Sequence, residues 1–137
     1  MDVGAWYWIG VFAGLGTALG VASTGILRRA LLAFVVAGVI IVAVAFAIEH
    51  WYEAVAGAIG ALCGAFGSAP IVAGALRRGG TRGATATLVG IAALLGAGLA
   101  FIPVVGYVEA LAVPALGWRT RRRTPDTHAG LRTLARD

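Results

Sequence analysis

The chain has 137 residues, of which 60% are hydrophobic and 12% are charged, and its mean hydropathy is +0.91. Soluble domains carry about 25% charged residues, so the composition excludes a typical water-soluble fold. The net charge is +5, but the basic residues are all arginines and mostly stand at the ends of apolar blocks. Nucleic-acid binding needs a basic face on a folded surface, and this placement therefore argues against a nucleic-acid partner.

Four uncharged blocks follow one another along the chain, and each is long enough to span a membrane. A spanning helix needs about 20 residues to cross about 30 Å of hydrocarbon. We therefore predict helices over residues 4–27, 30–48, 54–76 and 84–102. No positive segment precedes the first block, so we expect a retained helix rather than a cleaved signal peptide. The expected fold class is an all-α, polytopic membrane helix bundle.

The segment 103–118 leaves two topologies open. If it crosses the membrane, all arginines share one side, while Asp2, Glu49, Glu53 and Glu109 share the other. Its 15 residues from position 104 would form a helix of only about 22 Å, so the alternative is a segment lying at the outer surface. We favour a short fifth crossing. The positive-inside rule then predicts the cytoplasmic membrane (the inner membrane of a bacterium), with the N-terminus outside and the C-terminus inside.

The chain divides into a transmembrane bundle over 1–118 and a basic cytoplasmic tail over 119–137. The tail has the pattern of a short amphipathic helix, or of a frayed polar end. As a helix it would lie on anionic lipid headgroups, which attract arginines near a membrane surface.

The bundle itself contains a possible internal repeat. The sequence GILRR at 25–29 resembles GALRR at 74–78, which suggests two tandem, parallel helical hairpins related by an axis along the membrane normal.

Small residues at four-residue spacing give the strongest packing signal. In lipid, helices associate through close approach of their backbones rather than through a hydrophobic force. The second block is mostly bulky and β-branched, so we expect it to face lipid while the other three blocks lie inside. Whether the small-residue grooves serve intrachain packing or homo-oligomerisation is left open. The predicted packing residues are Gly10, Gly14, Gly16, Gly20, Gly60, Gly64, Gly90 and Gly96.

Five residues are candidates for a functional role. Pro70 should kink the third helix, with Ser68 or a neighbour relieving the freed backbone, or the kink could line a solute path. His50 and Glu53 in the sequence EHWYE could form a weak metal or proton site, although a solvated outer turn is favoured. Glu109 would be functional if it entered the bilayer deeply, and a position near the headgroups is favoured.

The sequence contains no catalytic motif. The single cysteine, Cys63, can form neither an intrachain disulfide nor a thiolate metal site, and we expect no cofactor and no metal. The favoured function is therefore non-enzymatic: a scaffold, a regulatory or assembly subunit of a membrane complex, or a homo-oligomer. The expected partners are the lipid bilayer and either a second copy or another membrane protein. The alternative is a small transporter or channel for an ion or small solute.

Overall fold

The structure is a computed structural model that describes residues 3–27, 29–48, 51–102 and 104–123. Within these ranges the chain is entirely helical apart from short turns, and no strand is present, so the expected all-α class is confirmed. The helices in chain order are α1 (Val3–Ile26), α2 (Ala30–Ala47), α3 (Trp51–Arg77), α4 (Arg82–Leu99) and α5 (Val105–Arg123).

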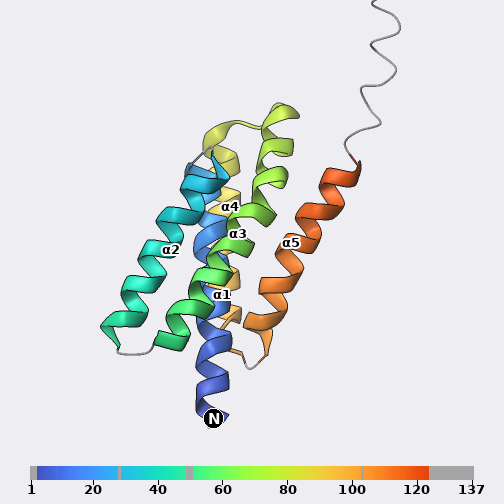
Figure 1. Cartoon of the computed structure of the whole chain (residues 1–137). Helices are drawn as coiled ribbons and strands as arrows, with labels where there is room; N and C mark the ends of the chain where they lie inside the picture. Colours follow the sequence, from blue (N-terminus) through green and yellow to red (C-terminus); the bar gives the residue numbers. More distant parts are fainter. Residues whose placement is uncertain (1–2, 28, 49–50, 103, 124–137) are drawn as a thin grey trace, which may run out of the picture.

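The helices alternate in direction along the bundle. Figure 1 shows α1, α3 and α5 running towards one end and α2 and α4 returning to the other, where the N-terminus lies. Helices α1 to α4 are long and apolar enough to cross a membrane. Helix α5 does not belong to that set, because its last turn is a run of arginines.

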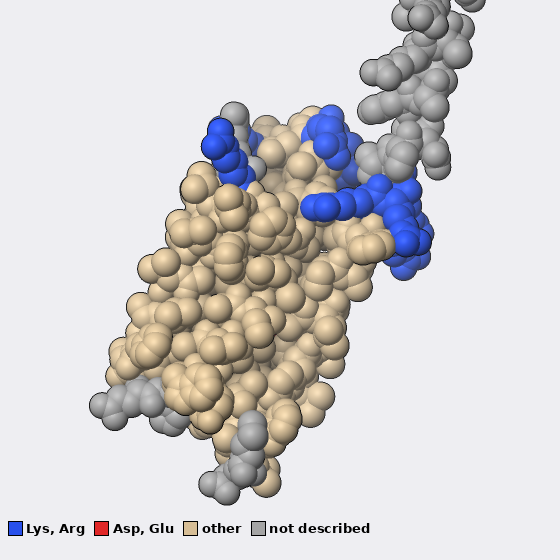
Figure 2. Space-filling view, viewed as in Figure 1, with Lys and Arg blue, Asp and Glu red and all other residues tan. Residues whose placement is uncertain are grey.

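The two ends of the bundle differ in chemistry. The described arginines gather where α1, α3 and α5 end and α2 and α4 begin, and we call this the arginine end. Figure 2 shows arginine side chains concentrated there, above a surface that is free of charged side chains on the face in view. The opposite end, which we call the aromatic end, carries Trp6, Tyr7, Trp8, Trp51, Tyr52 and Tyr107.

The core is a seam in which the backbones of α1 and α3 touch. A Cβ atom on Gly60 would overlap the carbonyl oxygen of Ala13, and one on Gly64 would overlap that of Thr17. From the other side, a Cβ on Gly16 would overlap a backbone carbonyl of α3. This is the close approach that small residues permit in lipid. We call this contact the α1–α3 seam; its glycines are Gly16, Gly20, Gly57, Gly60 and Gly64.

Helices α2 and α4 flank the seam, and α4 differs from expectation. Helix α2 buries a single stripe of residues, which are Ala33, Ala37, Gly38, Ile41 and Ala45. Helix α4 buries only Thr85 and Ala93 among its residues, although the fourth block was expected inside the bundle. A Cβ on Gly90 would meet no atom within 4 Å. Small-residue spacing alone does not specify which face of a helix is covered, and here α4 remains peripheral.

Helix α5 lies along α1 and α3. A Cβ on Gly106 would overlap the carbonyl of Gly10, and one on Gly117 would overlap that of Gly67. The Tyr107 hydroxyl donates to the carbonyl of Trp6 at 2.6 Å. With 19 residues, α5 is about 28 Å long.

The helix is longer than its apolar part because it continues through Arg121–Arg123. The expected boundary at 118/119 therefore lies inside α5. The expected amphipathic helix of the tail lies outside the described residues.

Candidate functional sites at the two ends of the bundle

A pair of buried hydroxyls joins α1 to α3 near the arginine end. The oxygens of Thr24 and Ser68 are 2.8 Å apart, and each residue is 5% exposed. Ser68 also lies 2.6 Å from the carbonyl oxygen of Gly64, and Thr24 lies 2.7 Å from that of Val21. A hydroxyl has one proton to donate. One hydroxyl therefore donates to the other, which in turn donates to a carbonyl of its own helix.

Pro70 lies in α3, two residues after Ser68. Proline has no N–H, so the carbonyl of Phe66, four residues earlier, loses its usual helical donor. The Ser68 hydroxyl contacts the carbonyl of Gly64 and not that of Phe66. The pair formed by Ser68 and Thr24 also connects two helices, which the sequence analysis did not anticipate.

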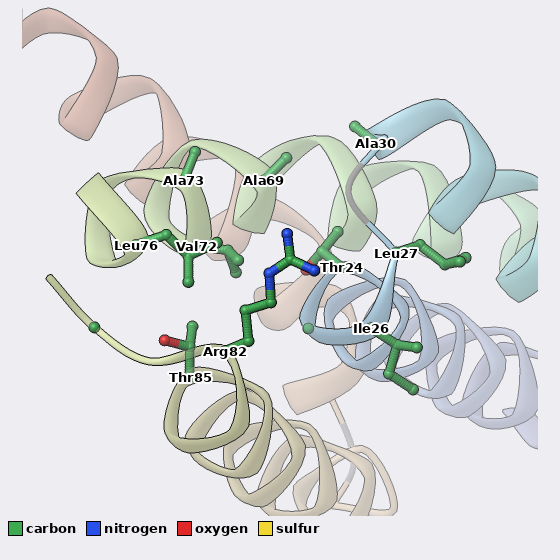
Figure 3. A pocket seen from close by; sticks show the side chains of 12 residues that line it. Thr24, Ile26, Leu27, Ala30, Ala69, Val72, Ala73, Leu76, Arg82 and Thr85 are labelled. Atoms are coloured by element: carbon green, nitrogen blue, oxygen red, sulfur yellow. The ribbon is translucent and has the colours of Figure 1, made fainter. Parts of the chain in front are cut away.

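A cavity of about 500 Å³ opens beside this pair at the arginine end. Its walls come from the ends of α1 and α3 and from the beginnings of α2 and α4, and most of its lining side chains are apolar. Figure 3 shows the Arg82 side chain extending from the start of α4 into the space between Val72 of α3 and Thr24 of α1. The volume is within the range of about 300–1,000 Å³ that is typical of small-molecule pockets.

The sequence analysis missed Thr24, Arg82 and Thr85, the polar side chains of this cavity. The available signal was a threonine near each of the two arginine-bearing turns, Thr24 before the first and Thr85 after the second. That pattern also describes helix capping, and Thr81 in the second turn does cap α4, accepting a hydrogen bond from the amide of Ala84 at 3.3 Å. Only the packing of α1 against α3 and α4 separates the two roles.

The aromatic end places Glu53 inside the protein. Helix α3 begins at Trp51, so Glu53 lies in its first turn and turns inward, where it is 3% exposed. The expectation of a solvated turn is therefore wrong for Glu53. Its Oε2 atom is buried and has no hydrogen-bond partner among the described residues. His50 lies outside the described residues, so the pairing of His50 with Glu53 stays a prediction.

Glu109 also points into the bundle. It is half-buried, with Oε2 3.2 Å from the Cβ position of Gly14 and Oε1 3.6 Å from that of Gly96. Its carboxylate thus lies between α1 and α4, and its expected position near the headgroups stays a prediction. Within the described ranges, no three His, Cys, Asp or Glu side chains are grouped so that they could hold a metal ion.

The hydroxyl pair gives a prediction about stability. In Thr24→Val and Ser68→Ala variants, a double-mutant cycle should give a coupling of about 0.6 kcal/mol, the average for hydrogen bonds between membrane helices. The measurement is unfolding of the purified protein in mixed micelles by titration with sodium dodecyl sulfate. Thr87→Val is the matched control, because the exposed Thr87 hydroxyl donates only within α4, to Gly83. A coupling indistinguishable from the Thr87–Ser68 cycle would contradict the bridge.

Comparisons with protein-family models, with curated proteins and with solved structures found no significant match to this chain.

Proposed function

We propose that this chain is a multi-pass protein of the cytoplasmic membrane with five crossings, its N-terminus outside and its arginine end in the cytoplasm. Cytoplasmic loops of membrane proteins are enriched in arginine and lysine, and aromatic side chains collect at membrane interfaces. The separation of the arginine end from the aromatic end supports this orientation. Burial of α5 against α1 and α3 at Gly106 and Gly117 supports the fifth crossing.

Within that membrane we propose a non-enzymatic role as a scaffold, a regulatory or assembly subunit, or a homo-oligomer. The observation that carries this proposal is the closed α1–α3 seam. Its backbones are in contact along the centre of the bundle, so there is no room between these two helices for a solute. A bundle with such a tight centre is suited to holding a fixed shape.

Helix α4 is the surface on which a partner helix would pack. Its side chains Leu88, Leu94 and Leu95 are exposed, and only two of its residues are buried. In a bilayer, such a face contacts lipid tails or another helix at similar cost. The candidates are a second copy of the chain and another membrane protein.

The alternative function is a transporter or channel for an ion or small solute. Two observations favour it: the cavity beside Thr24 and Ser68, and the inward-facing carboxylates of Glu53 and Glu109. Ionisable groups within membrane-spanning helices commonly mark ion pathways. The cavity and the carboxylates lie towards opposite ends of the bundle, with the closed seam between them.

Reconstitution separates the two functions. We expect vesicles that contain the protein to be as tight to protons and potassium ions as protein-free vesicles, and light scattering in micelles to show a defined assembly. The control is the Glu53→Gln variant, whose vesicles should be equally tight to protons and potassium ions. A leak above the protein-free level that disappears in Glu53→Gln or Ser68→Ala would instead establish the pathway function.

A further inference from the structure

We propose that the cavity at the arginine end binds the phosphate headgroup of an anionic membrane lipid, with the first part of the acyl chains against its apolar walls. Arg82 is the residue that recognises the phosphate. This site is distinct from any headgroup binding by the tail, and it does not depend on the proposed role as a scaffold or subunit.

The positive charge at this site favours the binding of an anion. Arg82 is exposed and forms no ion pair with any residue in the part of the chain that the structure describes. Its neighbours at the same end, Arg29, Arg77 and Arg78, are also positive. Among the described residues, no acidic side chain lines the cavity. A guanidinium group donates in a planar fork that matches two oxygens of a phosphate.

The start of α4 adds to this preference. Arg82 is the first residue of a helix of 18 residues, and Thr85 in its first turn lines the same cavity. The N-terminus of a helix carries a partial positive charge and favours a bound anion. The Arg82 side chain, the helix terminus and the residue Thr85 therefore lie at the same cavity.

The remaining walls favour a lipid over a free phosphate ion. Ile26, Leu27, Val72 and Leu76 contribute apolar surface to the cavity, and a hydrated inorganic ion gains nothing from such surface. Phosphate and acyl chain meet near the level at which a membrane-spanning helix ends, and the cavity lies at the ends of α1 and α3. The cavity therefore lies at the level where the phosphate and the first part of the acyl chains of a lipid would be found.

The test is native mass spectrometry of the full chain, released from uncharged detergent, with phosphatidylglycerol and phosphatidylcholine of identical acyl chains. We expect one phosphatidylglycerol to be retained in preference to phosphatidylcholine. Arg82→Gln should weaken that binding roughly tenfold, which is the effect of losing a charge-assisted contact. Arg77→Gln removes the same charge at the same end but is not part of the cavity lining, and it should change the affinity less than about twofold.

A second variant tests the cavity without changing charge. Ala73→Leu places extra volume inside the lining and should also weaken phosphatidylglycerol binding, while far-ultraviolet circular dichroism checks that the helices remain. Equal effects of Arg82→Gln and Arg77→Gln would reduce the interaction to general surface charge and overturn the proposal. Unchanged binding in a folded Ala73→Leu variant would do the same. Displacement of the lipid by millimolar inorganic phosphate would show that a free anion is the ligand, which would overturn the lipid assignment.

Discussion

Replacing Gly60 by alanine should lower the free energy of unfolding by at least about 2 kcal/mol, because overpacking a tight interior typically costs about 1–3 kcal/mol and here the obstacle is backbone. The added methyl group would overlap the carbonyl oxygen of Ala13. A side chain could rotate away, whereas a backbone carbonyl moves only if α1 and α3 separate. The whole seam must then open.

The matched control is Gly90→Ala on α4, where an added Cβ meets no atom within 4 Å. Both glycines lie inside helices, and alanine is the better helix former by about 1 kcal/mol. Gly90→Ala should therefore leave the stability unchanged or raise it slightly. The measurements are unfolding in mixed micelles and the rate of alkylation of Cys63, which lies next to Gly64 in α3. Equal stability of the two variants would show that the α1–α3 seam is not the core.

The extent of the helices could be predicted from the sequence because bilayer thickness dictates the length of an apolar block. The block at 30–48 became Ala30–Ala47, and the block at 84–102 became Arg82–Leu99. The deviation with the clearest consequence is at the start of α3, which begins at Trp51 instead of residue 54. Those three residues form the turn that carries Glu53 inward, so a small boundary shift changed the environment of a charged residue.

The candidate sites were less predictable, because they depend on contacts between distant parts of the chain. Thr24 and Ser68 are 44 positions apart, and neither residue carries a local signal for the other. Gly60 and Gly90 have similar small-residue surroundings in the sequence, yet only Gly60 touches another helix backbone. Helix packing decides which helix a small residue contacts. The spacing of small residues in a single sequence does not specify that packing.

Cysteine labelling should show on which side of the membrane α5 ends. In a Cys63→Ala background, cysteines at Arg77 and Arg123 should both resist a membrane-impermeant maleimide applied to intact cells. A cysteine at Val3, which is 87% exposed at the opposite end of the bundle, should be labelled. All three should react after permeabilisation. The expected contrast is close to all-or-none, because a reagent that cannot cross the bilayer reaches only one face.

Labelling of Arg123→Cys but not Arg77→Cys from outside would mean that α5 does not cross. The arginines would then divide into five on one side and six on the other, and the positive-inside rule would give almost no orientation signal. Such a topology would also have to break the contacts of Gly106 with Gly10 and of Gly117 with Gly67. Because α5 is the least apolar of the helices, a fifth crossing would depend on these backbone contacts to hold α5 in the membrane. We therefore expect Gly117→Leu to expose Arg123→Cys from outside while Arg77→Cys stays protected.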